Sequence, residues 1–542
     1  MIPTLYEVAR HTFVVLSPEI LLLLTAIAMM TLGVFVRLPR RAWCASAAVA
    51  MGVALITLLE IGEQRIDAYS AVITSDYFSE FGRILFLLTG LLLLCLAHDQ
   101  VEEERAPEFF GALLMIQAGA MLVASANELV FLFIGLELVS IPTYLLLYLP
   151  QRNRTTLEAA TKYFFLSIFS SGLLLFGLAY LYGMTGLSNL KAITFLSTHA
   201  AHASTQPFAM IALVFVLAGL GFRVAAVPFH FYAPDVYQGA PTVLTAMLSW
   251  IPKAIGYIAM LRALLAIVPA GAEPSSLAHR AVLLAWIVAV VTMTLGNTVA
   301  LMQTNLKRLL AYSSISHAGY LMIGIAVSFQ GAAGSNRVYF GAEGILFYLT
   351  AYALMTLGAF GVILLLGTPD RPVENVEDLA GLGRTQPVWA LSLAICLFSL
   401  AGIPPLIGFW GKFELFAAAF SAAAGPDGRL FWWLAVIGVL NSAIGAYYYL
   451  KIVVEMYLRQ PTSESPSPRV AWPTALSVVL CTVLTVIFGL FPAPIIHATR
   501  AAALAVVELP EPAGESTTPP TNTVPRQAEL NPTPGTIVAG DR

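Results

Sequence analysis

The segment VFLFIGLELVSIPTYLL, residues 130–146, carries one charged side chain, Glu137, in an otherwise apolar run. About 20 such residues are enough for a helix to cross the roughly 30 Å hydrocarbon core of a bilayer. An ionisable residue at the centre of such a helix costs roughly 2.5–3.5 kcal/mol on insertion scales, so its presence needs a reason. The segment therefore predicts a transmembrane helix with one acidic group at its middle.

Similar apolar runs recur along almost the whole chain. Of its 542 residues, 58% are hydrophobic and 11% are charged, whereas about 25% of the residues of an average soluble protein are charged. Because helices satisfy their own backbone polar groups in lipid, we expect an all-α integral membrane protein with about fourteen transmembrane helices. The expected helices are 14–36, 42–61, 81–97, 109–125, 128–148, 160–182, 208–231, 241–267, 280–302, 309–328, 342–366, 388–420, 431–457 and 471–491.

Charge and cysteine content exclude several classes of function. The net charge of −3 is spread along the chain and forms no basic face for nucleic acid. Cys44, Cys95, Cys396 and Cys481 lie far apart in apolar stretches, which excludes a CxxC-type metal or iron–sulfur site. The sequence has no Gly-rich phosphate loop after a strand. We therefore expect no cofactor or metal in this chain, and we expect transport.

The loops and the C-terminal segment predict orientation and extent. If the loop with Arg37, Arg40 and Arg41 is cytoplasmic, that side holds the larger share of Lys and Arg, as the positive-inside rule requires. Residues 508–542 are rich in Pro and Thr and lack apolar periodicity. Such composition cannot offset the entropy of ordering. We expect residues 1–507 to form the membrane domain and 508–542 to be a disordered tail.

Two segments interrupt the helical pattern, LGFRVAAVPFHFYAPDVYQGAP at 220–241 and FSLAGIPPLIGFWGKF at 398–413. Prolines in both remove backbone donors inside apolar runs. Each segment lies in the fourth helix of a five-helix block, and paired interruptions indicate an inverted repeat. We expect two such repeats, at about 109–267 and 280–457, with two broken helices. Irregular backbone at membrane depth lines a water-filled cavity or is buried in protein, so we expect one cavity per repeat.

Ionisable and hydroxyl side chains recur inside the expected helices. Along 241–267, polar residues at spacings of three and four share one face, and helices 309–328 and 342–366 repeat the pattern. Hydroxyl bonding to the preceding turn is the alternative explanation of these stripes, and static ion pairs or snorkelling are the alternative for the charges, above all near helix ends. The stripes comprise Thr242, Thr245, Ser249, Lys253 and Tyr257, then Ser313, His317 and Tyr320, then Tyr348, Tyr352 and Thr356.

Several long motifs closely resemble those of the antiporter-like proton-pumping subunits of respiratory complex I. They are VPFHFYAPDVYQGAP at 227–241, LKRLLAYSSISHAGY at 306–320 and LAGIPPLIGFWGKF at 400–413. The early SPEI at 17–20 and the stretch NELVFLFIGLELVSIPTYLL at 127–146 resemble the subunit N family of NADH-quinone oxidoreductase. The resemblance covers about residues 14–495.

The resemblance implies a fold and a role. The fold is one of fourteen helices with two inverted five-helix repeats. The role is proton translocation, driven by the energy released when NADH reduces quinone elsewhere in the complex. It also implies NADH, FMN, iron–sulfur clusters and quinone in partner subunits, contact with other membrane subunits and the lipid bilayer, only indirect contact with quinone, and a multi-pass location in the bacterial inner membrane.

The same resemblance implies roles for seven residues. The family's helix 5 glutamate matches Glu137, and its partnering lysine matches Lys162. In this interpretation their ion pair is a switch. Protons load on one lysine and pass by a histidine to another before they leave. The implied path residues are Lys253, His317 and Lys412, with His230 in the polar wall and Arg223 at a position where many members carry lysine.

Arg223 departs from the family pattern. Arginine is effectively never deprotonated in proteins, so it supplies a fixed positive charge and does not pass a proton on. Three rival functions are a paralogous subunit of a cation/proton antiporter or membrane-bound hydrogenase, a secondary transporter of a small solute, and a scaffold. Discrete polar pockets for a solute are not visible in the sequence, and the cost of intramembrane charges argues against a scaffold.

Overall fold

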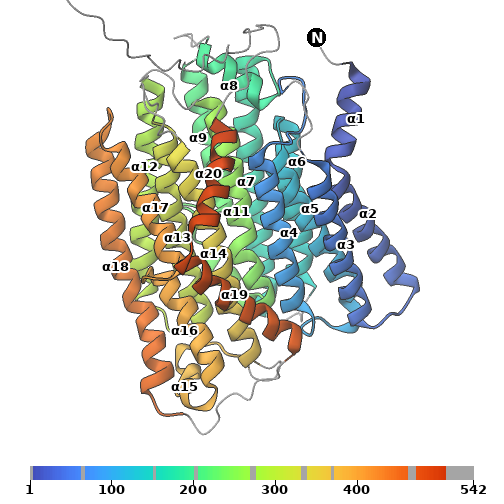
Figure 1. The fold of residues 1–542 in the computed structure, drawn as a ribbon, viewed down its shortest axis with the longest axis vertical. Helices are drawn as coiled ribbons and strands as arrows, with labels where there is room; N and C mark the ends of the chain where they lie inside the picture. The colour runs from blue at the N-terminus through green and yellow to red at the C-terminus, as the bar shows by residue number, and fades with distance from the viewer. Residues whose placement is uncertain are drawn as a thin grey trace, which may run out of the picture. The chain divides into compact units, whose positions relative to one another are not determined.

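The computed structural model describes most of the chain, and every named element in it is a helix (Figure 1). The expected disordered tail at 508–542 lies outside the described residues. The described ranges are 4–62, 68–149, 154–199, 206–268, 276–330, 339–367, 372–461 and 471–507.

The first half of the described chain comprises α1 (Leu5–Val15), α2 (Ser17–Phe35), α3 (Arg40–Ile61), α4 (Tyr77–Ala97), η1 (Glu103–Arg105), α5 (Ala106–Ser125), α6 (Leu129–Tyr148), α7 (Arg154–Thr185), α8 (Leu190–His199), α9 (Gln206–Arg223), α10 (Ala233–Gly239) and α11 (Thr242–Ile267). The second half comprises α12 (Ser276–Ala300), α13 (Leu306–Ser328), α14 (Tyr339–Leu366), η3 (Val376–Leu379), α15 (Leu382–Thr385), α16 (Pro387–Ala401), α17 (Ile407–Ala422), α18 (Gly428–Leu458), α19 (Trp472–Leu490) and α20 (Ala493–Val507).

The prediction of an all-α membrane protein is confirmed. Among the described residues, 12 helices are long and apolar enough to cross a membrane. Three further apolar helices are shorter, at Pro207–Arg223, Pro387–Ala401 and Ala493–Val506. Of these, α9 ends at Arg223 and α16 ends at Ala401. Both ends lie within the two segments where the sequence predicted interruptions.

Both interruptions have irregular backbone. The first includes Ala225 with a φ of 57°, and the second places Gly402 in the left-handed region with a φ of 89°. Each segment also contains one cis X–Pro bond, Val227–Pro228 and Pro404–Pro405. The chain then re-enters a helix as α10 and as α17, respectively.

Three helices of ten or more residues were not found by the search for long apolar runs. They are α1, α8 and α20, of 11, 10 and 15 residues. Each is shorter than the roughly 20 residues that a span needs, so apolar length does not reveal it. The hydrophobic face of α20 packs against α14 and α4, and tertiary packing of this kind is what stabilises short helices.

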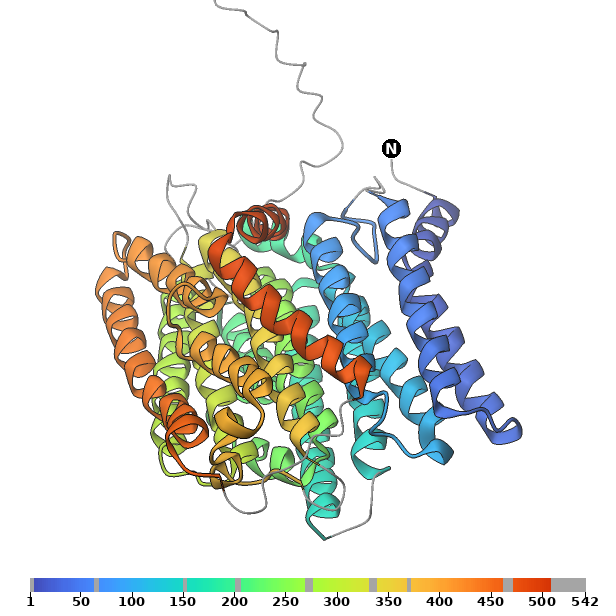
Figure 2. The same ribbon diagram turned by 60° about the horizontal axis from the view of Figure 1, so that its bottom comes forward.

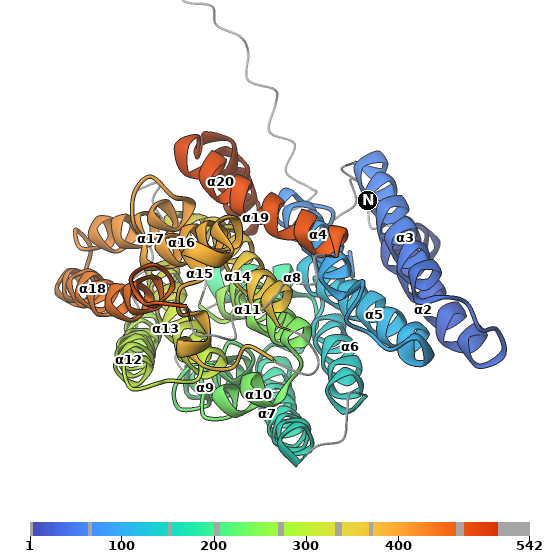
Figure 3. The same cartoon turned by 90° about the horizontal axis from the view of Figure 1, so that it is seen from below.

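The interior of the bundle is formed by α11, α13 and α14, which are almost wholly buried. Seen from below in Figure 3, these three helices are surrounded by the others, while α2 and α3 lie at one edge and α12 and α18 lie toward the opposite side. Figure 2 shows α19 crossing this bundle obliquely. The interior helices are the same ones in which the sequence showed polar stripes.

Buried ion pairs join α2 to α4 and α4 to the interior helix α11. Arg83 of α4 donates to both carboxylate oxygens of Glu19 in α2, at 2.8 and 2.6 Å. Arg262 of α11 donates to Ala124 O at 2.9 Å and lies 3.4 Å from Asp76, which caps α4. Burial raises the pKa of Asp76, but the cations Arg262 and Lys191 and the hydrogen bonds from Ser79 lower it overall. Both pairs join helices far apart in sequence.

Close backbone contact holds α12 against α13. A Cβ added at Gly319 would lie 2.4 Å from Met293 N, and one added at Gly296 would lie 2.6 Å from Ser316 N. Small residues of this kind allow membrane helices to approach closely. The contact determines how near α13 can come to the rest of the second half.

We predict that Gly319→Ala destabilises the folded protein by about 1–3 kcal/mol, because an overpacked contact forces backbone shifts. The matched control is Gly172→Ala in α7, where an added Cβ meets no atom within 4 Å and the helix gains about 0.5–1 kcal/mol from alanine. The measurement is the thermal unfolding midpoint of the purified full-length protein. Equal midpoints for the two variants would contradict the packing argument.

Candidate functional site

Lys253 lies at the centre of the buried helix α11 and is 3% exposed. Its Nζ donates to the carbonyl and, at 2.6 Å, to the hydroxyl of Ser314 in α13. It also donates to Tyr352 OH of α14 at 3.3 Å and lies 4.4 Å from the centroid of that ring. Within the described residues no carboxylate forms an ion pair with Lys253. The amine is therefore held by neutral acceptors alone.

His317 lies on α13, buried at 1% exposure, between two tyrosine hydroxyls. Its Nδ1 shares a hydrogen bond with Tyr348 OH, and its Nε2 lies 2.8 Å from Tyr449 OH. The centroid of the imidazole lies 5.1 Å from that of the Tyr352 ring and 5.9 Å from that of Tyr320. A ring with a hydroxyl at each nitrogen can accept a proton at one and release it at the other.

Lys412 lies in α17, just beyond the second interruption. Its Nζ donates to Ala401 O and to Ser442 Oγ, each at 2.9 Å. Ala401 is the last residue of α16, and a helix C-terminus favours a cation. Gly402 permits this approach, because a Cβ there would lie 3.0 Å from Lys412 Cδ. The interruption thus creates the binding place for the lysine.

These three predicted residues lie along one line of contacts. Tyr352 touches Lys253 on one side and His317 on the other. Tyr320 in turn touches His317, and its ring centroid lies 5.1 Å from Lys412 Nζ. The line crosses the buried interior from the first half of the chain to the second. The structure therefore brings together Lys253, His317 and Lys412.

The prediction that Glu137 forms an ion pair with Lys162 was wrong. Glu137 pairs instead with Arg223, whose NH2 lies 2.9 Å from Glu137 Oε1. The other guanidinium nitrogen donates to Ser140 Oγ at 2.6 Å and to Leu136 O at 3.2 Å, so the side chain binds α6 at several points. The planar fork of arginine can donate to several acceptors at once, which a lysine amine does not match.

Lys162 lies in a different cluster. Its Nζ contacts Asp235 of α10 at 2.5 Å and Glu158 at 2.7 Å. The second oxygen of Asp235 accepts from Arg308 of α13 at 2.6 Å. Asp235 thus joins α7, α10 and α13, and it gives Lys162 a carboxylate on a neighbouring element. Sequence spacing did not reveal that α10 packs against α7.

His230 lies in the first interruption, away from the line of contacts. Its Nδ1 is buried without a hydrogen-bond partner among the described atoms. In the part of the chain that the structure describes, no hydrogen bond joins His230 to Lys253 or His317. The predicted place of His230 in a polar wall of the axis stays a prediction.

Sequence reasoning missed several residues of the site. Most are hydroxyls on helices other than those of the predicted charges. Tyr449 of α18 is 132 positions from its partner His317, and Tyr237 of α10 lies 3.2 Å from Ser314 Oγ. The one feature of the sequence that could have indicated Asp235 and Tyr237 is their position inside the proline-interrupted motif at 227–241. The missed residues are Tyr237, Asp235, Ser314, Ser442 and Tyr449.

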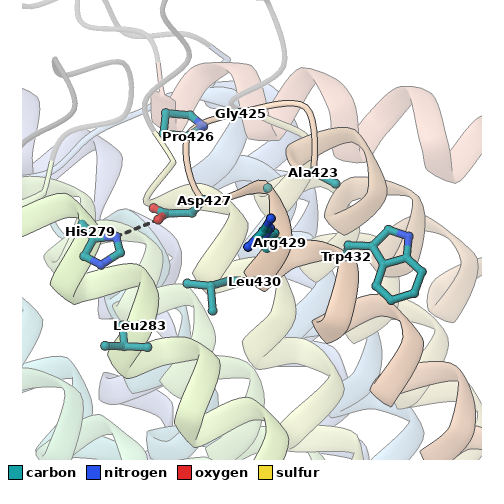
Figure 4. A pocket seen from close by; sticks show the side chains of 10 residues that line it. His279, Leu283, Ala423, Gly425, Pro426, Asp427, Arg429, Leu430 and Trp432 are labelled. Carbon is teal, nitrogen blue, oxygen red and sulfur yellow. Dashed lines mark hydrogen bonds and ion pairs between the residues drawn. The ribbon is translucent and has the colours of Figure 1, made fainter.

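Two cavities open toward the ends of the bundle. One, of about 750 Å³, lies between the start of α12 and the turn from α17 to α18, where His279 Nδ1 lies 2.6 Å from Asp427 (Figure 4). None of the residues that line it belongs to the line of contacts. The second, of about 310 Å³, lies beside the start of α11. No group of three or more metal-ligating side chains occurs among the described residues.

Comparison with known proteins relates this geometry to a family. A family model described as NADH:quinone oxidoreductase/Mrp antiporter, TM, matches residues 126–445. NADH-quinone oxidoreductase subunit N of Trichlorobacter lovleyi is 40% identical over 487 residues, covering 89% of this chain and 95% of that protein.

Solved structures have the same fold. A chain of respiratory complex I from Thermus thermophilus, with bound aureothin, is 31% identical with a TM-score of 0.72, covering 89% of this chain and 99% of that one. A chain of the Mrp complex from Dietzia sp. DQ12-45-1b has a TM-score of 0.76, covering 91% of this chain and 98% of that one, but is 22% identical, which shows the fold alone. The chain therefore belongs to the family of NADH-quinone oxidoreductase subunit N, the antiporter-like, proton-translocating membrane subunit of respiratory complex I.

Proposed function

We propose that protons bind Lys253, pass by His317 to Lys412 and leave on the opposite side of the membrane. The observation that carries this path is the unbroken line of contacts from Lys253 through Tyr352, His317 and Tyr320 to Lys412. Each lysine along it is held by carbonyl and hydroxyl groups. Losing the proton therefore leaves no buried carboxylate without its cation.

The ion pair of Glu137 with Arg223 is the proposed switch. A buried pair that separates exposes each charge to its surroundings, and a tenfold change in the proton affinity of a neighbouring group corresponds to about 1.36 kcal/mol. Closing the pair neutralises both charges and opening it leaves a field that acts on neighbouring sites. Lys162 and Asp235 form a second pair nearer the end of the bundle, and His230 lies in the interruption between α9 and α10.

The two interrupted segments support a fourteen-crossing arrangement. If α9 with α10 and α16 with α17 each form one broken crossing, these two add to the 12 continuous spans. The repeats at about 109–267 and 280–457 then contain one break each, as inverted repeats of transporters do. Lys412 follows the break of the second repeat.

The energy for this movement comes from partner subunits. NADH, FMN, iron–sulfur clusters and quinone are assigned to them, and this chain contacts other membrane subunits and lipid. We propose that the protein lies in the bacterial inner membrane, with the loop of Arg37, Arg40 and Arg41 facing the cytoplasm. A separate cation/proton antiporter subunit is disfavoured because an NADH-quinone oxidoreductase subunit N is 40% identical to this chain over 487 residues.

The path is tested by Lys253→Met in the intact complex. Methionine fills a similar volume but holds no proton, so NADH-driven proton pumping in vesicles should fall by roughly tenfold or more, a change in barrier of about 1.4 kcal/mol. Lys451→Met, at an exposed position on α18, is the control and should pump normally. Pumping by Lys253→Met at the wild-type rate would remove Lys253 from the path.

Glu137→Gln tests the switch. The amide preserves the shape but leaves the Arg223 charge without its carboxylate, so we expect the complex to assemble while proton pumping falls. The control is Glu102→Gln. It removes a carboxylate that is 57% exposed and pairs with Arg105 three residues along the chain. Such surface pairs contribute about 0–1 kcal/mol to stability. Proton uptake by reconstituted vesicles is the measurement. Full pumping by Glu137→Gln would rule out a switching role.

Two substitutions at Arg223 separate the effect of its charge on pumping from the effect of its hydrogen-bond geometry. Arg223→Lys keeps the positive charge, so most pumping should persist. Arg223→Ala leaves Glu137 without its cation in the membrane, and breaking a buried pair costs about 3–5 kcal/mol, less for this partly exposed carboxylate. We expect that variant to lose pumping. An inactive Arg223→Lys variant would show that the fork of hydrogen bonds, and not the charge, is what the position provides.

A further inference from the structure

Asn297 of α12 is fully buried and takes part in no step of the proposed path. A buried amide costs free energy unless its hydrogen bonds are made. Its Nδ2 donates to Met293 O in the preceding turn at 2.9 Å and to the Tyr320 hydroxyl of α13 at 3.0 Å. Its Oδ1 accepts from the Tyr448 hydroxyl of α18 at 3.0 Å. The amide is therefore bonded to both neighbouring helices.

Glycines on both sides bring Asn297 within reach of these partners. The adjacent Gly296 packs so closely on α13 that an added Cβ would lie 2.6 Å from Ser316 N. On α18, a Cβ added at Gly445 would lie 3.1 Å from Asn297 Oδ1. The amide thus occupies a narrow space that the backbones of α13 and α18 define.

A second amide extends this network along α18. Asn441 Oδ1 accepts from Asn297 Nδ2 at 3.3 Å, and Asn441 Nδ2 donates to Thr294 Oγ1 at 3.2 Å. The next residue of α18 is Ser442, whose hydroxyl accepts from Lys412. Amide side chains donate and accept hydrogen bonds without titrating. The network therefore lies beside Lys412 as a neutral support.

Tyr320 lies between this network and Lys412. Its hydroxyl bonds to Asn297, and among the described residues no hydrogen bond joins that hydroxyl to Lys412. The amine of Lys412 lies instead over the ring, with Nζ 5.1 Å from the centroid. Tyr320 therefore turns its hydroxyl toward α12 and the face of its ring toward the lysine.

The bond to Asn297 fixes the direction of the Tyr320 hydroxyl. The other contacts of the ring are apolar or edge-on, with centroids 5.9 Å from that of His317 and 6.2 Å from that of Phe416. Such packing supports a ring but does not specify where its hydroxyl points. Within the described part of the chain, Asn297 is the one hydrogen-bond partner of this hydroxyl.

The direction of the hydroxyl matters for what Lys412 meets. A ring face attracts an ammonium through its quadrupole and offers no oxygen that could bond to the neutral amine. A hydroxyl turned toward the lysine could bond to either form of the amine. The observed arrangement thus gives Lys412 a neighbour that interacts chiefly with its charged form.

We propose that Asn297 is a positioning residue for proton translocation, which holds the Tyr320 hydroxyl toward α12 and so keeps the ring face on Lys412. The inference rests on the proposed function, in which Lys412 receives the proton that passes His317. No covalent bond forms or breaks at Asn297. Loss of its amide lets the ring turn and weakens the contact of the ring with the ammonium.

The test compares Asn297→Leu, Tyr320→Phe and the double variant in the intact complex. Leucine fills a similar volume without a donor, and phenylalanine keeps the ring without the hydroxyl. We expect each single change to slow NADH-driven proton pumping, per amount of assembled complex, by roughly threefold to tenfold, as for a weakened cation–ring contact. Because Asn297 acts through that hydroxyl, the double variant should pump no more slowly than either single variant.

A merely structural role of Asn297 gives a different result. Independent packing defects multiply their effects on a rate, so a double variant slowed by the product of the two single effects would overturn the positioning role. Unchanged pumping by Asn297→Leu would also overturn it. The control is Thr298→Val, the next residue of α12, whose hydroxyl bonds only to its own preceding turn. It should pump at the wild-type rate.

Tyr448→Phe tests the same link if Asn297→Leu fails to assemble. It removes the hydroxyl that donates to Asn297 Oδ1, so it should slow pumping in the wild-type background and have no further effect in Tyr320→Phe. Equal slowing in both backgrounds would overturn the inference.

Lys412→Met separates this inference from the proposed function. Loss of pumping by Lys412→Met together with normal pumping by Asn297→Leu would overturn the positioning role and leave the path intact. Normal pumping by Lys412→Met would overturn both.

Discussion

A charge buried in a membrane protein must be given partners, and the kind of partner separates two classes of residue in this chain. Arg83, Arg262 and Arg223 are bound to carboxylates, in Glu19, Asp76 and Glu137. Lys253 and Lys412 are bound to carbonyls and hydroxyls. A paired arginine keeps its proton and anchors helices. A lysine among neutral acceptors can release its proton without leaving an unpaired anion, so the interior can both be stable and titrate.

Helix ends at the interruptions supply a carbonyl acceptor for Lys412 and for Lys307. An intact helix leaves its carbonyls bonded within the helix, whereas the last carbonyls of a helix have no intrahelical donor. Ala401 at the end of α16 accepts from Lys412, and Ala240 at the end of α10 accepts from Lys307. In both halves, then, the end of a helix provides a carbonyl for one amine, in the interior for Lys412 and at the end of the bundle for Lys307. This explains why prolines and glycines occur where an uninterrupted helix would be more stable in lipid.

The sequence predicted the parts of the site that depend on position within one helix. The spacing of Thr245, Lys253 and Tyr257 places them on one face, and the structure buries that face. Partners from other helices were not predictable in this way. Arg223 binds Glu137 because α9 ends at that residue beside α6, and Tyr449 reaches His317 from α18. Periodicity carries no information about which faces meet, and the short helices α1, α8 and α20 give too weak an apolar signal.

The identity of residue 223 constrains the direction from which protons would reach Lys253 in the proposed path. A guanidinium does not give up its proton, so the end of α9 cannot deliver one even though it packs near α11, where the Arg223 Cβ lies 3.5 Å from a Cβ built at Gly256. The hydrogen bonds of the Lys253 amine run to Ser314 of α13 and Tyr352 of α14. In the proposed path Tyr352 leads onward to His317, so the side of Ser314 is left as the direction from which Lys253 would receive protons. In the proposed path, the fixed charge at Arg223 thereby makes entry and onward transfer use different neighbours of Lys253, which is the separation that a one-way path requires.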